Sequence, residues 1–221
     1  DFCLSRGLGD VYKRQGYTMS IIPPLNREQV LDWYQSYVMR TYGRVPMVFE
    51  RGEGAYLWDT DGKRYLDFVS GGRAGTALGH RHPKVIAAMR EQMEKLLFLS
   101  NDFHHPPGAA LARMLSERSG GRVAFFCNSG TEASETAIKL ARKWGHTHGG
   151  PEKHEILTFE RSFHGRSMGA LSATAQTKFQ QGFEPVLPGF TYLPFNDLEA
   201  LRRAINPNTC AIFLEPVQGE S

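Results

Sequence analysis

The sequence predicts an α/β protein with a largely parallel sheet covered by helices on both faces. Apolar runs at 155–159 and 210–214 are typical of buried strands, and a third run at 122–128 leads into a helical pattern at 133–144. Strands that alternate with helices favour parallel pairing, because parallel neighbours need a crossover connection. In open sheets of this kind, ligands gather at the carboxyl ends of the strands.

The composition is that of a globular protein with no electrostatic case for nucleic acid or membrane binding. The 221 residues are 41% hydrophobic and 22% charged, and the net charge of +3 is small and dispersed. No apolar run is long enough to predict a membrane span or the centre of a signal peptide.

Cysteine and histidine usage predicts neither a disulfide framework nor a metal site. The three cysteines are widely spaced, and we expect Cys127 and Cys210 to be inert core thiols of a cytoplasmic protein because both lie in apolar runs. The histidine pairs at 80/82, 104/105 and 146/148 lack a carboxylate or cysteine at ligand spacing.

Residues 1–18 show no periodic apolar pattern. Most of this stretch resembles translated sequencing adapter, so we interpret it as a non-native or disordered tail, with Met19 as a plausible start. No function is sought there.

Before the central stretch, capping and turn signals predict two helices and a hairpin. Asn26 and Gln29 form a capping box for a helix that reaches Val38. Asp61-Gly62 lies between two strand-like runs and predicts a hairpin. An amphipathic helix is expected at 83–99, with proline in its first turn.

Two further helices are expected, one on each side of the central stretch. A shorter one is expected at 107–115, and Asp197 caps one that carries Leu198, Leu201 and Ile205.

The turn between the 122–128 run and the helix after it has the chemistry of an anion site. Ser129 and Glu132 have capping-box spacing. The helix that follows has one apolar stripe with Ile138 beside it; the stripe consists of Ala133, Ala137, Ala141 and Trp144. Gly130 and Thr131 add bare amides and a second hydroxyl at the positive end of the helix dipole. Neither a Walker loop nor a Gly-x-Gly-x-x-Gly fingerprint is present. Local chemistry leaves a phosphate site and a plain helix cap as equal alternatives.

Asn128-Ser129-Gly130-Thr131-Glu132-Ala133 resembles the phosphate-binding turn of class III aminotransferases, which use pyridoxal phosphate on the type I fold. Further segments agree in the expected order, and the likeness runs from about Tyr42 to Ser221; these segments are 77–83, 162–167, 194–198 and 215–220. The resemblance implies that 19–70 is the N-terminal segment of the small domain and that 71–221 is the N-terminal portion of the large cofactor-binding domain, both incomplete.

The resemblance also implies roles for individual side chains. Ser129, Gly130 and Thr131 would bind the phosphate of pyridoxal 5'-phosphate, and Phe163 would stack on its ring with His164 beside it.

Arg166 would pair with the substrate α-carboxylate, because its planar fork binds two oxygens at once. Glu215 and Glu220 would border the substrate pocket. Arg73 is a departure, since relatives usually carry an aliphatic residue or tyrosine there.

The implied activity moves an amino group from acetylornithine or a related ω-amino acid to 2-oxoglutarate. Ornithine, succinylornithine, γ-aminobutyrate and a lysine derivative are alternative donors, and the family implies a homodimer in the cytoplasm.

No lysine here matches the one that attaches the cofactor covalently in the family, whose members are roughly twice this length. We therefore expect residues 19–221 alone to be inactive and poorly folded. The alternative from another class is a non-catalytic phosphate-binding module that is stable as it stands.

Overall fold

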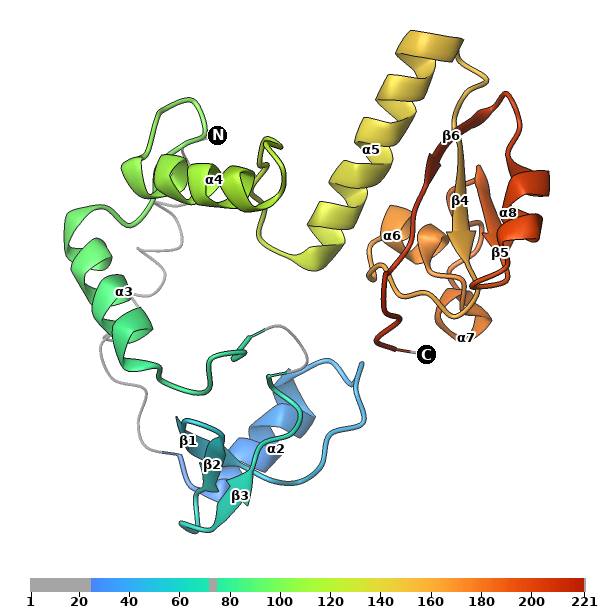
Figure 1. Ribbon diagram of the computed structural model, residues 1–221. Helices are drawn as coiled ribbons and strands as arrows, with labels where there is room; N and C mark the ends of the chain where they lie inside the picture. The colour runs from blue at the N-terminus through green and yellow to red at the C-terminus, as the bar shows by residue number, and fades with distance from the viewer. Residues whose placement is uncertain (1–24, 72–74, 221) are drawn as a thin grey trace, which may run out of the picture. The chain divides into compact units, whose positions relative to one another are not determined.

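The structure, a computed structural model, describes residues 25–71 and 75–220 (Figure 1). These residues form two compact units, 1–103 and 104–221, which are described separately. The tail at 1–18 and Arg73 lie outside the described residues. The predicted boundary between residues 70 and 71 concerns the domains of a complete enzyme, and it stays a prediction.

The first unit contains two helices and an antiparallel sheet. The helices are α2 (Arg27–Tyr37) and α3 (Pro83–Lys95), and the sheet has the order β1 (Phe49–Glu53), β2 (Tyr56–Asp59), β3 (Arg64–Leu66).

The helix cap and the hairpin predicted for this unit are both confirmed. Asn26 accepts a hydrogen bond from the Gln29 amide at 2.9 Å, and the Gln29 side chain accepts one from the Asn26 amide at 3.1 Å. In the hairpin turn, the Asp59 carboxylate accepts the amides of Asp61 and Lys63 at 3.1 and 2.8 Å.

The second unit contains a parallel sheet with helices on both faces, as predicted. Its elements are α4 (Pro106–Arg118), α5 (Gly130–Gly149), β4 (Glu155–Phe159), α6 (Met168–Ala173), α7 (Thr177–Gln180), β5 (Phe190–Leu193), α8 (Leu198–Ala204) and β6 (Thr209–Ile212). β4 lies in the middle and pairs in parallel with both β5 and β6.

Alternate residues of β4 build the two halves of the core. Ile156 packs with Ile138 of α5 and Ala173 of α6. On the opposite face, Leu157 and Phe159 form a second cluster that includes Leu201 and Ala204 of α8. This two-residue period is expected for a strand that is buried on both faces.

The prediction of a buried strand at 122–128 is wrong. The segment has no strand assignment, and the side chains of Val123 and Phe125 are 98% and 67% exposed. A strand needs the amides and carbonyls of a neighbour. None of the described strands pairs with this segment.

The expectation for the cysteines is wrong for Cys127, which is exposed. Cys210 is partly buried, and this burial raises the pKa of its thiol.

The face of α5 that packs on the sheet only partly matches the predicted stripe. Ile138 is buried and Ala141 packs against the same cluster, as predicted. Ala133, Ala137 and Trp144 are exposed, whereas Gly145, which lies outside the predicted stripe, is buried. α5 approaches the sheet so closely at Gly145 that an added Cβ would clash with the Lys153 carbonyl and lie 2.7 Å from Cys210 Cβ. α5 therefore packs on the sheet through the face that carries Gly145.

No helix within 25–71 and 75–220 combines the length and apolarity needed to cross a membrane.

Candidate functional site

Segments far apart in the sequence meet at the carboxyl ends of the strands in the second unit. The Thr131 hydroxyl, in the first turn of α5, lies 2.6 Å from the Ser167 hydroxyl in the segment after β4. The Phe163 amide donates to the Glu215 carboxylate at 2.9 Å, which joins the segments that follow β4 and β6. Residues predicted separately from the sequence therefore lie around one edge of the sheet.

The start of α5 is capped by side chains of its own turn. The Ser129 hydroxyl accepts the Glu132 amide at 3.3 Å, and the Glu132 carboxylate accepts the Asn128 amide at 2.7 Å. The carboxylate thus reaches one residue further back than a capping box requires. Hydrogen bonds from Asn128 and then Ser129 lower the pKa of Glu132.

The amides of Gly130 and Thr131 are hydrogen-bond donors that this cap does not use. In the part of the chain that the structure describes, neither amide donates a hydrogen bond. No atom lies within 4 Å of the position that a Cβ of Gly130 would take. Open amides at the positive end of a 20-residue helix are chemically suited to a phosphate group.

A hydrogen-bonded group beside this turn was missed in the sequence analysis. Ser167 donates from its amide to the Thr131 hydroxyl at 3.1 Å and from its hydroxyl to Glu135 at 2.6 Å. Glu135 and Ser167 are 32 residues apart, and no periodic pattern connects them. The only local signal was the spacing of Thr131 and Glu135, which puts both on one face of a helix.

Arg166 and Phe163 share one aromatic neighbour, Phe179 of α7. The rings of Phe163 and Phe179 meet edge to face, with centroids 5.9 Å apart and planes at 73°. The Arg166 guanidinium lies 4.4 Å from the Phe179 centroid and 5.7 Å from the Phe163 centroid. Arg166 itself is exposed, so aromatic faces orient a cation that remains accessible.

His164 is turned into the interior of the second unit. Its side chain is buried, its ring is stacked on Phe213, and its amide donates to the Thr174 hydroxyl at 2.9 Å. Desolvation lowers the pKa of His164, and the charge of Glu215 acts in the opposite direction.

The two predicted acidic residues differ in their surroundings. Glu215 is partly buried and holds the Phe163 amide, whereas Glu220 is exposed. Between them, Gln218 donates to the Glu160 carbonyl at 2.9 Å and ties this segment to the end of β4. Among the described residues, no group of three or more histidine, cysteine, aspartate or glutamate side chains is arranged to hold a metal ion.

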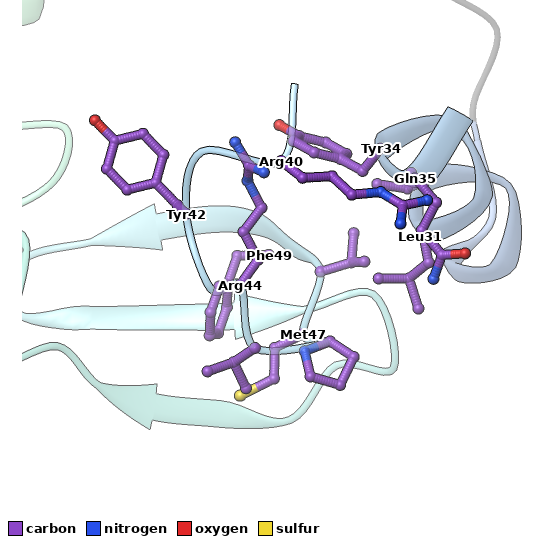
Figure 2. A pocket seen from close by; sticks show the side chains of 12 residues that line it. Leu31, Tyr34, Gln35, Arg40, Tyr42, Arg44, Met47 and Phe49 are labelled. Atoms are coloured by element: carbon purple, nitrogen blue, oxygen red, sulfur yellow. The ribbon is translucent and has the colours of Figure 1, made fainter. Parts of the chain in front are cut away.

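A separate cavity of about 770 Å³ lies in the first unit, between α2 and the segment that leads into β1. Figure 2 shows Arg44 near Tyr42 and Tyr34, and the Arg44 guanidinium lies 5.4 Å from the Tyr34 ring centroid and 5.8 Å from that of Tyr42. Arg40 also lines the cavity, but none of the predicted site residues does.

Comparison with known proteins agrees with the resemblance seen in the sequence. The family described as Aminotransferase class-III matches residues 37–221. Acetylornithine aminotransferase from Myxococcus xanthus is 49% identical over 184 residues, which cover 83% of this chain and 46% of that protein. The enzyme of the same name from Gloeobacter violaceus is 49% identical over 187 residues, covering 85% of this chain and 46% of that protein.

Solved aminotransferases share the fold. Ornithine aminotransferase from Toxoplasma gondii superposes with a TM-score of 0.83 at 32% identity, covering 94% of this chain and 48% of that one. Acetylornithine aminotransferase from Elizabethkingia anophelis gives a TM-score of 0.71 at 31% identity, covering 89% of this chain and 46% of that one. The predicted type I transferase fold is confirmed, and the chain spans about half the length of the curated relatives it matches.

The family match covers most of the chain and includes every segment on which the resemblance was based. The chain belongs to the class-III aminotransferase family, whose members depend on pyridoxal 5'-phosphate.

Proposed function

We propose that the protein is an aminotransferase that moves the amino group of acetylornithine, or of a related ω-amino acid, to 2-oxoglutarate with pyridoxal 5'-phosphate as cofactor. One observation carries the proposal: the open amides of Gly130 and Thr131 at the start of α5 lie beside the segment that bears Phe163 and Arg166. The names of relatives that are 45–49% identical support acetylornithine as the donor.

The residues of this chain would divide the binding of cofactor and substrate among them. The Gly130 and Thr131 amides would hold the phosphate, and Phe163 would lie against the ring. Arg166 would bind the α-carboxylate of the amino acid through two parallel hydrogen bonds and so fix the orientation of its Cα–H bond. When bound, the cofactor supplies an electron sink for the carbanion at Cα.

His164 and Glu215 would support the cofactor side of the site. The amide of Phe163 is held by the Glu215 carboxylate, and the ring of the next residue, His164, is stacked on Phe213 in the interior. Both residues would therefore act by holding Phe163 in place. A contact of Glu220 with the substrate remains part of the proposal.

Other amino donors stay open. The superposition on ornithine aminotransferase supports ornithine as an alternative, and succinylornithine and γ-aminobutyrate belong to the same chemical class. A homodimer located in the cytoplasm, with no nucleic acid or membrane partner, completes the proposal.

A matched pair of substitutions at Gly130 tests the phosphate site. Gly130→Pro removes one amide donor at the first helical position, where proline is well tolerated, and Gly130→Ala keeps the amide. No atom lies within 4 Å of the position that a Cβ would take, so the alanine methyl group meets no neighbour.

The measurement is the affinity of the complete polypeptide that contains this sequence for pyridoxal 5'-phosphate and for pyridoxal, by fluorescence titration. We expect the proline variant to bind pyridoxal 5'-phosphate about tenfold more weakly, since a hydrogen bond to a charged group contributes about 1.5–3 kcal/mol. Its affinity for pyridoxal, which lacks the phosphate, should not change. Equal affinities of the proline and alanine variants for the ester would refute a phosphate site at this turn.

A further inference from the structure

A chain of short hydrogen bonds connects the first two turns of α5 to the segment after β4. The Thr131 and Ser167 hydroxyl oxygens are 2.6 Å apart, and the Ser167 hydroxyl lies 2.6 Å from a Glu135 carboxylate oxygen. The same oxygen of Glu135 accepts the Ala170 amide at 3.0 Å. Glu135 thus binds both the end of this segment and the first turn of α6.

The chemistry of the groups sets the direction of these hydrogen bonds. A carboxylate only accepts, so the hydrogen of the Ser167 hydroxyl goes to Glu135. The Ser167 oxygen then accepts the hydrogen of the Thr131 hydroxyl, and the Thr131 oxygen accepts the Ser167 amide at 3.1 Å. The Thr131 hydroxyl is therefore unable to donate to an anion without breaking its bond to Ser167.

The other hydroxyl of the turn is committed in the same way. Ser129 donates to the Glu132 carboxylate at 3.1 Å while it accepts the Glu132 amide at 3.3 Å. Both hydroxyls of the turn thus give their hydrogens to partners within the protein. The amides of Gly130 and Thr131 are what remains for a phosphate.

Close packing keeps Thr131, Ser167 and Glu135 in this arrangement. Gly165 has φ +132°, and a Cβ added there would lie 2.5 Å from the Thr131 hydroxyl oxygen. A Cβ added at Gly169 would lie 2.8 Å from one Glu135 carboxylate oxygen and would clash with the other. The two glycines let the backbone after β4 lie directly against the side chains that it must hold.

We propose that Glu135, acting through the Ser167 hydroxyl, is a positioning residue that turns the Thr131 hydroxyl away from the anion and leaves the Gly130 and Thr131 amides as the phosphate donors. This inference rests on the proposed function, because it assumes that the cofactor phosphate binds at this turn. It assigns Glu135 and Ser167 to the binding of the cofactor although neither touches it.

The test compares Glu135→Gln, Ser167→Ala and Thr131→Val, with Ser167→Thr as the control that keeps the hydroxyl. The quantity measured is the ratio of the affinities for pyridoxal 5'-phosphate and pyridoxal in the complete polypeptide. A general loss of packing lowers both affinities, so the ratio reports the phosphate contact alone. We expect Thr131→Val and Ser167→Thr to leave the ratio unchanged within about twofold, since the Thr131 hydroxyl does not face the anion. Ser167→Ala and Glu135→Gln free the Thr131 hydroxyl to donate to the phosphate and should raise the ratio about three- to tenfold, which is the range of a single hydrogen bond.

The double variant Glu135→Gln/Ser167→Ala should match the two single variants within about twofold, because both residues act through the Thr131 hydroxyl. Thr131→Val/Ser167→Ala should show no rise, because that hydroxyl is then absent. If Thr131→Val alone lowers the ratio, the hydroxyl touches the phosphate directly and the inference is wrong, while the phosphate site stands. An unchanged ratio in Ser167→Ala, or a rise that persists in Thr131→Val/Ser167→Ala, also overturns it. If Gly130→Pro fails to lower the ratio, the proposed phosphate site itself falls, so the two failures are distinguishable.

Discussion

The imidazole of His164 lies flat against the ring of Phe213, with centroids 4.0 Å apart and an angle of 16° between the planes. The stack belongs to the interior of the second unit, where His164 is only 8% exposed. Burial favours the neutral form of an imidazole, because the charged form loses its hydration.

Burial of His164 predicts a specific loss of stability in mild acid. Desolvation lowers its pKa from the ordinary value of 6.5 in the folded protein, so the unfolded chain binds the proton more readily. Its contribution to the free energy of unfolding is present above pH 6.5 and is lost as the pH falls from 6.5 through the lower folded value. We expect His164→Gln to flatten the decline between pH 7.5 and 5.5 in urea denaturation. Identical pH profiles for the two proteins would contradict this.

The carboxylate of Asp67 predicts the pH dependence of the first unit. It accepts the Ser70 and Val69 amides at 2.9 Å each, and the His80 ring nitrogen lies 2.7 Å away. Hydrogen bonds from Ser70, then from His80 and Val69, hold the pKa of Asp67 well below its ordinary value of 3.8.

The stabilisation by Asp67 is therefore present above pH 3.8 and is lost as the pH falls below that value. We expect Asp67→Asn to lower the midpoint of thermal unfolding at pH 7 and to differ progressively less from the wild type below pH 3.8. Circular dichroism melts at pH 7, 4 and 3 measure this. A difference that stays constant over these three pH values would show that the charge of Asp67 plays no part.

We predict that Phe179 affects substrate binding indirectly, by orienting the Arg166 guanidinium. Loss of the guanidinium in Arg166→Ala should raise KM for the amino acid at least tenfold, because charge-assisted hydrogen bonds to the carboxylate are lost. Phe179→Leu removes the aromatic face 4.4 Å from the guanidinium and should raise KM about two- to fivefold with little change in kcat.

The control for Phe179 is Phe183→Leu, because Phe183 is 59% exposed and lies on the same stretch of chain. In the Arg166→Ala background, Phe179→Leu should have no further effect on KM. A further rise in KM in that background would show that Phe179 acts independently of Arg166.

Gly145 and Gly149 are predicted to respond in opposite ways to the same substitution. Glycine to alanine in a helix interior ordinarily stabilises by about 1 kcal/mol. At Gly145 the new methyl group meets the Lys153 carbonyl and Cys210, so Gly145→Ala should destabilise the second unit by about 1–3 kcal/mol.

At Gly149 the neighbour is the flexible side chain of Lys153, which is able to move aside, so Gly149→Ala should be neutral or slightly stabilising. Urea denaturation of both variants gives the comparison. Equal stability of the two variants would mean that α5 does not lie as close to the sheet at Gly145 as described.

Local sequence patterns predicted the elements of this fold where the local chemistry alone decides the outcome. The capping box of Asn26 with Gln29 and the turn at Asp61-Gly62 need only neighbours in the chain, and both form. The strand at 155–159 was found because an apolar run of this length fits a strand with both faces covered.

The predictions that failed depended on partners that are distant in the sequence. The run at 122–128 is apolar enough for a strand, but pairing decides whether it becomes one. The packed face of α5 was predicted only in part, because Gly145 lies directly against the sheet while Ala133 and Ala137 are exposed. The strand β5 was missed because Phe190–Leu193 is too short to show a period.

In the candidate site too, residues with a local signal were predicted and residues that depend on distant partners were missed. Ser129, Gly130 and Thr131 were singled out from one turn, since a helix start has a local signature. Glu135 and Ser167 were not, because their contact exists only once the segment after β4 has folded against α5.

The commitment of both hydroxyls at the start of α5 has a consequence for how such a site is inherited. Every amino acid except proline has a main-chain amide donor. An anion contact made by such amides therefore does not depend on the identity of the side chains around it. If the cofactor phosphate binds to the Gly130 and Thr131 amides as proposed, substitutions at Ser129 and Thr131 that preserve the backbone conformation would leave this contact intact. Sequence searches would overlook relatives that have changed in this way, whereas a comparison of backbone structure would find them.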